Sequence, residues 1–290
     1  MSNMVVRTNI FSLNAHRNMR NVGLEQGRAS SRLSSGYRIN SAADDAAGLA
    51  ISETMRAQIR GLDQASRNAQ DGQALIQTAE GGMNEITNMM QRIRELLVQA
   101  SNDTNTTVNR QQLQMEITQL TAEISALAGR VQFNGMSLLQ GDPPNTNTGL
   151  AGDDGELWFQ IGPNSEQGFT VSLRAAAESI RNAHTELYSI DIEDESGREI
   201  SDHIDEINTL MNAINLERAG LGAAQNRMDY TIRSLEISSE NLSDAESRVR
   251  NADMAREMMR FTMANVLQQA SVSMLTQANQ LPNNLLQLLR

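Results

Sequence analysis

Apolar residues recur every seven positions along two long stretches of the chain, residues 55–97 and 207–249. A repeat of this kind is typical of helices that pack along one seam, as in coiled coils. A second apolar seam accompanies the first stretch, at Ile59, Ala79, Ile86, Ile93 and Ala100. The heptad residues that we expect to pack the helices are Met55, Leu62, Ala69, Ile76, Met83, Met90 and Leu97, then Ile207, Ile214, Leu221, Met228, Leu235, Leu242 and Val249.

Each long helix is preceded by a serine, a residue type that caps helix N-termini. Ser41 precedes Asp44 and Asp45, and Ser201 precedes Asp202 and further carboxylates. A serine hydroxyl accepts a hydrogen bond from a free backbone N–H group, and carboxylates in the first turn complement the helix dipole. We therefore expect the first long helix to begin near residue 42 and Ser201 to cap the second.

A shorter apolar run with alternating spacings of four and three predicts another helix, which Gly129 would end. Its apolar residues are Leu113, Ile117, Leu120, Ile124 and Leu127. The segment Ser101–Asn109 is rich in Asn and Thr and is typical of a turn. An antiparallel helical hairpin is therefore expected between residues 43 and 140.

The middle of the chain carries the signals of β-hairpins and loops. Asn134-Gly135 is a hairpin-turn dipeptide, and residues 141–155 are rich in Gly, Pro, Asn, Thr and Asp. Residues 156–161 and 168–173 are short apolar segments that flank Gly162-Pro163, so they could pair as a hairpin. We expect residues 141–173 to form a small hairpin and loop insertion within a helical rod.

The two ends of the chain have apolar series of their own. These residues are Ile10, Leu13, Val22, Ala29 and Leu33 at the start, and Leu267, Met274, Leu281 and Leu288 at the end. Neither end has a core in which to bury such a face. The pattern favours self-assembly through the terminal helices, with a four-helix bundle closed within one chain as the alternative.

Composition agrees with a mainly α-helical protein. Aromatic residues make up only 3% of the 290 residues and cysteine is absent, so Ala, Leu, Ile and Met must fill the core without disulfides. The net charge is −11, and residues 141–206 contain 15 acidic residues against 3 arginines. We expect the acidic middle to face water.

Charge and hydropathy also exclude several partners. Arginine is the only strongly basic residue type, and the arginines form no stripe of the kind that binds nucleic acid. No apolar run approaches the roughly 20 residues of a membrane span, and no cleavable signal peptide is visible. We expect no nucleic-acid binding and no insertion into a membrane.

No arrangement of residues predicts catalysis. His16, His184 and His203 lack the spacing of metal ligands, and adjacent helical residues such as Asp44 and Asp45 point about 100° apart. The motif HExxH is absent. We predict a protein that is not an enzyme and holds no cofactor or metal.

Seven strings of the sequence have a distinctive composition. They are Leu33–Ser52 (LSSGYRINSAADDAAGLAIS), Glu80–Ile86 (EGGMNEI), Gln91–Gln99 (QRIRELLVQ), Phe133–Leu139 (FNGMSLL), Leu221–Arg227 (LGAAQNR), Glu240–Arg248 (ENLSDAESR) and Met274–Gln280 (MLTQANQ). These strings closely resemble motifs of bacterial flagellin, the subunit of the flagellar filament. The resemblance covers nearly all of residues 5–140 and 207–290 in the family's order.

The resemblance implies two helical domains, each built from both ends of the chain. Residues 1–42 and 250–290 would form an inner tube domain, and residues 43–140 with 174–249 a surrounding rod domain. The short middle implies that bulky outer domains are missing. The expected function is polymerisation into an extracellular filament for motility, after export without a cleavable signal peptide.

The resemblance also implies partners. These are further copies of the chain, an export chaperone, the filament cap and the hook junction proteins. The flagellin-sensing Toll-like receptor of vertebrates reads a face of the family whose matching positions here are Gln91, Arg92, Glu95, Leu96 and Glu116.

Two other classes share the long heptads. A hook–filament junction protein belongs to the same superfamily, but its central region usually departs more from these strings. A coiled-coil signalling rod would lack the strings and would not need its termini to assemble.

Overall fold

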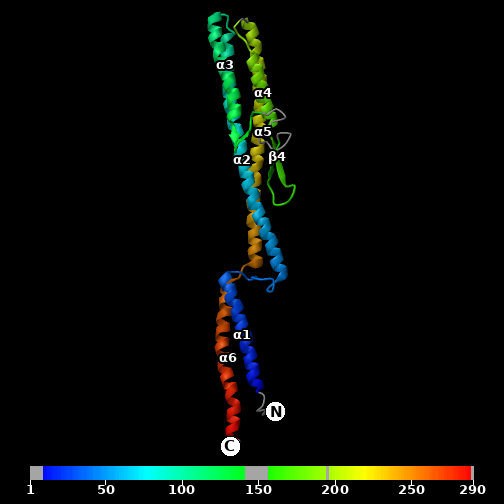
Figure 1. Cartoon of the computed structure of the whole chain (residues 1–290), viewed down its shortest axis with the longest axis vertical. Helices are drawn as coiled ribbons and strands as arrows, with labels where there is room; N and C mark the ends of the chain where they lie inside the picture. The colour runs from blue at the N-terminus through cyan, green and yellow to red at the C-terminus, as the bar shows by residue number, and fades with distance from the viewer. Residues whose placement is uncertain (1–8, 141–155, 194–195, 289–290) are drawn as a thin grey trace. The chain divides into compact units, whose positions relative to one another are not determined.

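The structure, a computed structural model, describes residues 9–140, 156–193 and 196–288, with side chains as far as residue 280. The expected loop at 141–155 and the side chains of Leu281 and Leu288 lie outside the described residues. The described part of the chain is mainly α-helical with two small antiparallel hairpins, which confirms the expected fold class (Figure 1). The helices are α1 (Ile10–Ser35), α2 (Ala46–Ala100), α3 (Thr107–Arg130), α4 (Arg174–Ser189), α5 (Gly197–Arg250) and α6 (Met254–Leu288).

The chain divides into two compact units. Unit 1 consists of residues 1–59 and 240–290, and unit 2 consists of residues 60–239. Unit 1 therefore combines an N-terminal and a C-terminal segment, unit 2 is one continuous segment, and the long helices α2 and α5 contribute to both.

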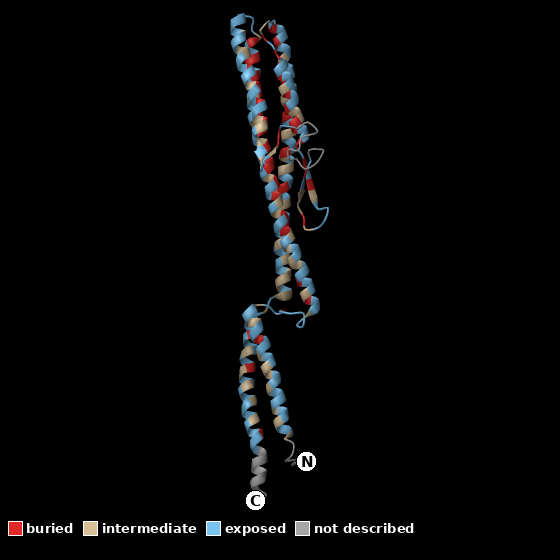
Figure 2. Cartoon of the chain, in the orientation of Figure 1, coloured by how far each residue is buried: buried red, intermediate tan, exposed pale blue. Residues whose placement is uncertain are grey.

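The core of unit 2 follows the heptads. On α5 one residue in every seven is buried, at Ile200, Ile207, Ile214, Leu221, Met228 and Leu235. On α2 both apolar seams are buried over residues 62–100, with Ile76, Met83, Ile86, Met90 and Ile93 fully enclosed (Figure 2). Polar contacts tie the same helices together, because Arg218 Nη2 donates to Glu80 Oε1 at 2.7 Å and Arg94 Nε donates to Asn208 Oδ1 at 2.9 Å. The outermost heptad residues Met55, Leu242 and Val249 belong to unit 1 and are half-buried.

The helix α3 folds back beside α2, where Arg92 donates to Glu116, and α4 packs against α3. The buried residues of α3 include Ile117 and Ile124, and the Gln114 side chain donates to the Ile190 carbonyl just after α4 at 2.9 Å. The apolar face of α4 is buried at Ala176, Ala177, Ile180, Ala183 and Leu187.

Two hairpins complete unit 2. Strands β1 (Gln132–Phe133) and β2 (Met136–Ser137) are joined by Asn134 and Gly135, whose φ values of 50° and 80° define the expected tight turn. Strands β3 (Glu156–Gln160) and β4 (Gly168–Ser172) pair with Leu157 opposite Val171. The predicted hairpin around Gly162-Pro163 is therefore present, and it bonds to α2 where Asn68 donates to the Gln160 carbonyl at 3.0 Å.

The adjacent glycines of α2 differ in their surroundings. A methyl group on Gly82 would lie 2.6 Å from Val131 Cγ2, so Gly82 allows the segment after α3 to approach the helix closely. Gly81 faces open space. Neither glycine interrupts α2, which is continuous from Ala46 to Ala100.

The expected caps of the two long helices are wrong. Asp44 accepts hydrogen bonds from the N–H groups of Asn40 and Ser41, which makes residues 41–44 a turn. The cap of α2 is instead Asp45, whose Oδ1 accepts from Gly48 N at 2.9 Å.

The start of α5 and the end of α3 also differ from the prediction. Ser196 and Glu199 cap α5 reciprocally, because each side chain accepts a hydrogen bond from the other residue's backbone N–H. Ser201 therefore lies inside the helix. Gly129 does not end α3, which continues to Arg130 and is capped at its start by Thr106.

Candidate assembly surface

In unit 1 the terminal helices α1 and α6 form an antiparallel pair (Figure 1). Near one end of the pair, Asn9 Nδ2 donates to the Ala278 carbonyl at 2.7 Å and Ser12 Oγ donates to Asn279 Oδ1 at 2.8 Å. Farther along, Gln26 Nε2 donates to Asn265 Oδ1 at 2.5 Å. The ends of the chain are thus joined by polar contacts between residues about as far apart in sequence as the chain allows.

The buried positions of the seam between these helices are occupied by small or charged residues. The buried residues of α6 are Glu257, Ala264 and Ala278, spaced by multiples of seven, and the buried residue of α1 is Ala29. Small side chains let the two backbones approach closely but bury little apolar area. Among the described residues of the two helices, no large apolar side chain is fully buried.

The large apolar side chains lie mostly on the outside of the pair. Among the described residues, twelve large apolar side chains on α1 and α6 are exposed: Ile10, Phe11, Leu13, Leu24, Met254, Met258, Met259, Met263, Val266, Leu267, Val272 and Met274. A helix whose surface is apolar on several sides is normally buried by neighbouring structure. Uncovered, this surface is of the kind that marks a protein interface.

Five of these residues form one stripe along α6. Met259, Met263, Val266, Leu267 and Met274 are separated by four, three, one and seven residues, which places them on one side of the helix. The buried residues Glu257, Ala264 and Ala278 fall on an adjacent side of the helix. We call these five residues the outer stripe.

The structure divides the apolar residues that the sequence singled out at the termini. Ile10 and Leu13 on α1 are exposed, as are Leu267 and Met274 on α6. Leu33 and Val22 are half-buried on the α1 side of the seam. The periodicity therefore identified apolar residues of both faces without separating the seam from the outer surface.

Short connectors lead out of the helix pair and bond to each other. Gly36, with φ 75°, ends α1 in the left-handed conformation, and its carbonyl accepts from Ala252 N at 2.9 Å. Arg38 N donates to the Arg250 carbonyl at 2.7 Å. The chain segments that enter and leave the terminal pair are thus held side by side.

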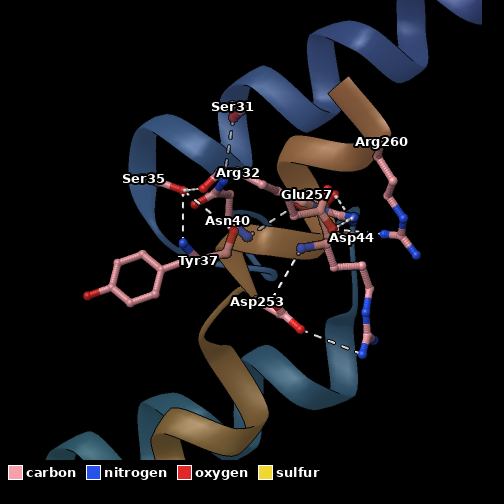
Figure 3. A network of polar contacts seen from close by, with 10 residues as sticks. Ser31, Arg32, Ser35, Tyr37, Asn40, Asp44, Asp253, Glu257 and Arg260 are labelled. Carbon is pink, nitrogen blue, oxygen red and sulfur yellow. Dashed lines mark hydrogen bonds and ion pairs between the residues drawn. The ribbon is translucent and has the colours of Figure 1, made fainter. Parts of the chain in front are cut away.

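A buried carboxylate lies where α1, α6 and the connector meet (Figure 3). Glu257 is only 4% exposed, and its Oε1 lies 2.8 Å from Arg260 Nη1 and 3.6 Å from Arg32 Nη1. Arg32 also lies 3.9 Å from Asp44. Sequence reasoning missed Arg32 and Glu257, although a charged residue in phase with Ala264 and Ala278 could have indicated a buried ion pair.

Hydrogen bonds at the connectors stabilise ionised carboxylates. The backbone N–H of Ser41 is the largest of several influences that lower the pKa of Asp44 below its ordinary value of 3.8. The hydrogen bond from Arg250, at 2.7 Å, lowers the pKa of Glu53. The Arg250 guanidinium also lies over the Tyr37 ring, 4.8 Å from its centroid.

On unit 2, four of the five positions that match the receptor-binding face of the family are exposed. Arg92 Nε donates to Glu116 Oε1 at 2.9 Å and Arg92 Nη1 donates to Glu95 Oε2 at 3.1 Å, and these bonds raise the pKa of Arg92. Gln91 is exposed beside them. Leu96 differs, because it is 1% exposed and belongs to the core.

Among the described residues, the candidate metal ligands do not come together. No group of three or more His, Asp or Glu among them is arranged to hold a metal ion. His203 Nδ1 lies 2.9 Å from Glu206 Oε2, and His184 stacks on Tyr188. Within the described residues, no helix is both long enough and apolar enough to cross a membrane.

The fold and this surface define a class of protein, in which helical subunits expose apolar area on their paired terminal helices that other subunits can cover. Residues 6–143 match the bacterial flagellin N-terminal helical region, and residues 204–289 match the bacterial flagellin C-terminal helical region. The chain belongs to the bacterial flagellin family. It is a structural protein, a subunit of the flagellar filament.

Individual relatives agree over the whole length. The chain is 48% identical to a flagellin of Halalkalibacterium halodurans, over 99% of this chain and all of the relative. It is 43% identical to the flagellar filament 33 kDa core protein of Treponema phagedenis and 42% identical to a flagellin of Bacillus subtilis, each over 99% of this chain and all of the relative.

A solved structure shares the fold at low identity. A putative flagellar hook-associated protein from Vibrio parahaemolyticus is 11% identical, with a TM-score of 0.59 over 72% of this chain and all of that one. This likeness concerns the fold alone. The matches at both ends of the chain favour flagellin over a hook junction protein or a signalling rod.

Proposed function

We propose that the chain polymerises through the outer apolar surface of α1 and α6, which copies of the chain cover in turn. The observation that carries this proposal is the inverted arrangement of the helix pair. Small and charged residues occupy its buried positions, whereas twelve large apolar side chains lie exposed on the described parts of the two helices. Within the described residues of unit 1, nothing covers this surface.

The free energy gained by covering this surface is comparable with the cost of association. Each of these side chains is about half to two-thirds exposed, so covering one contributes roughly 1 kcal/mol. Covering all twelve would contribute about 10 kcal/mol, comparable with the association cost of about 4–15 kcal/mol. Because the gain and the cost are comparable, assembly depends on subunit concentration, as expected for a polymer that grows from its end.

We take this interface to be heterologous, with one face of each copy meeting a different face of the next copy. A heterologous contact that does not close into a ring generates a helical filament. In this proposal residues 1–42 and 250–290 form the inner tube domain, since the bonded connectors at Gly36 and Ala252 mark where the chain leaves the helix pair. Residues 43–140 and 174–249 form the rod domain, with 141–173 as its small insertion, and the acidic middle faces outward.

The same surface suggests what the subunit meets before assembly. An export chaperone would cover the apolar residues of α6, and the filament cap and hook junction proteins would meet the same helices at the ends of the filament. Export through the flagellum's own channel would bring the chain outside the cell. These partners, and the extracellular location, rest on membership of the family.

Substitution of two equally exposed valines, one on the outer stripe and one on unit 2, tests the assembly surface. Val266 on the outer stripe is 60% exposed and Val108 on α3 of unit 2 is 61% exposed. We expect Val266→Asp to raise the critical concentration for seeded polymerisation by at least about tenfold, since a buried unpaired charge is costly. Val108→Asp should leave it unchanged.

Sedimentation of polymer from monomer after seeding measures both variants. Equal critical concentrations for the two would contradict the proposed surface. A chain that lacks residues 251–290 should form no filaments at all while the helices of unit 2 remain folded.

A second candidate function is recognition by the flagellin-sensing Toll-like receptor of vertebrates. The observation that favours it is the exposed group of Gln91, Arg92, Glu95 and Glu116 on α2 and α3, in which Arg92 holds both glutamates in place. Leu96 would act only from within the core, by fixing the helix that carries Arg92.

Soluble monomer applied to receptor-bearing cells tests this function. Arg92→Ala should reduce activation, whereas Arg130→Ala, which removes a different exposed arginine paired with a glutamate, should not. Failure of the unaltered monomer to activate the cells would refute it.

A further inference from the structure

The methionines of this chain are unevenly distributed between core and surface. Met83, Met90 and Met228 in the core of unit 2 have no exposed surface. Among the described residues six methionines are exposed, and five of them lie on α6: Met254, Met258, Met259, Met263 and Met274. The sixth, Met115, lies on α3 of unit 2.

Exposed thioethers have a chemistry that leucine or valine would lack. The chain contains no cysteine, so no thiol competes for an oxidant. A hydroperoxide transfers one oxygen atom to the methionine sulfur, which gives up two electrons. The O–O bond breaks and an S–O bond forms. With hydrogen peroxide the second oxygen leaves as water, and the product is a sulfoxide.

We infer that the exposed methionines of α6, above all Met259, Met263 and Met274 on the outer stripe, are an oxidation site that controls whether the subunit can assemble. This inference rests on the proposed assembly surface. In the free subunit the three side chains are 65%, 63% and 64% exposed, so a peroxide reaches them. In the polymer a neighbouring copy would cover them.

The sulfoxide would act on assembly through polarity. Oxidation converts a flexible apolar side chain into a polar one with a strong hydrogen-bond acceptor. Its neighbours on the stripe, Val266 and Leu267, offer no side-chain donor. Burying such an acceptor without a partner is unfavourable, so we expect each sulfoxide on the stripe to weaken subunit addition about tenfold.

The timing of the modification follows from the same geometry. Oxidation acts on subunits before they are added, and the assembled filament protects the stripe. Because methionine sulfoxide is reduced by methionine sulfoxide reductases, the block is reversible. Oxidised subunits would thus be excluded from a growing filament, and the excluded fraction would rise with the peroxide exposure of the subunits.

The test uses the full chain treated with hydrogen peroxide, and the readout is the seeded elongation rate after treatment divided by the rate before it. Three proteins are compared: the unaltered chain, the triple variant Met259→Leu, Met263→Leu, Met274→Leu, and Met115→Leu. Mass spectrometry of peptides measures the sulfoxide at each position, and circular dichroism measures helix content.

We expect the ratio to fall at least about tenfold for the unaltered chain and for Met115→Leu, and far less for the triple variant. Reductase treatment of the oxidised unaltered chain should restore its rate. An oxidised unaltered chain that elongates at its starting rate would overturn the inference while leaving the proposed assembly surface intact. An equal fall in the triple variant would also overturn it. Failure of the untreated chain to elongate would instead count against the assembly surface itself.

Discussion

The buried carboxylate of Glu257 allows a quantitative test of what holds α1 against α6. Glu257→Gln keeps the size of the side chain and removes its charge. The change leaves Arg260 in solvent, since its side chain is 57% exposed, but it leaves Arg32, 23% exposed, without its partner in the seam. The expected destabilisation therefore comes mainly from Arg32.

The magnitude follows from burial on each side. Breaking a fully buried ion pair by removing one partner costs about 3–5 kcal/mol. Arg32 is partly exposed and keeps Asp44 at 3.9 Å, so we expect about 2 kcal/mol for Glu257→Gln. The control Arg260→Gln removes a largely exposed partner and should cost only about 0.5 kcal/mol.

Amide hydrogen exchange in unassembled protein is the assay, because it reports the opening of individual helices. A loss of about 2 kcal/mol corresponds to roughly thirtyfold faster exchange in α1 and α6, with the core of unit 2 unaffected. Equal acceleration by Glu257→Gln and Arg260→Gln would refute the reasoning. So would full additivity of Arg32→Gln and Glu257→Gln, since coupled residues are not additive.

Three further outcomes are expected from the structure. Ile214→Ala, at a buried heptad position of α5, should destabilise unit 2 by about 2–5 kcal/mol in thermal or urea unfolding, and an unchanged midpoint would contradict the core assignment. Gly168→Ala should displace the Trp158 indole, which lies against Gly168, and the change is visible in tryptophan fluorescence because Trp158 is the only tryptophan; an unshifted spectrum would refute the contact. The lowered pKa of Asp44 means that its carboxylate stabilises the folded connector above pH 3.8, and that this contribution is lost as the pH falls through the folded pKa. Asp44→Asn should therefore flatten part of the acid-induced loss of helix measured by circular dichroism; an unchanged acid profile would contradict it.

Much of unit 2 could be predicted from the sequence, because burial there follows one strict period. On α5 the buried residues from Ile207 to Leu235 are the heptad residues themselves. The turn at Asn134 and Gly135 was also predictable, because it depends on these two residues alone. Both adopt the positive φ values that this dipeptide favours. Where one face of a helix is apolar and the rest polar, the pattern alone determines which side is buried.

Helix boundaries were less predictable. Ser41 and Ser201 are suitable caps by residue type, yet Asp45 and Ser196 cap the helices. A cap requires both a side-chain acceptor and a backbone that turns at that residue. Several residues of the right type stood within a few positions of each helix start, and only the folded connector selected among them.

The assembly surface was predicted in kind but not in detail. The sequence by itself determined that both ends of the chain carry an apolar series and that the middle is acidic. Only the tertiary structure decided which residues form the seam and which the outer stripe. The physical reason is that α6 is apolar on several sides, so its periodicity is compatible with more than one buried face. The side against α1 was decided by close approach at Ala264 and Ala278 and by the ion pair of Glu257 with Arg32.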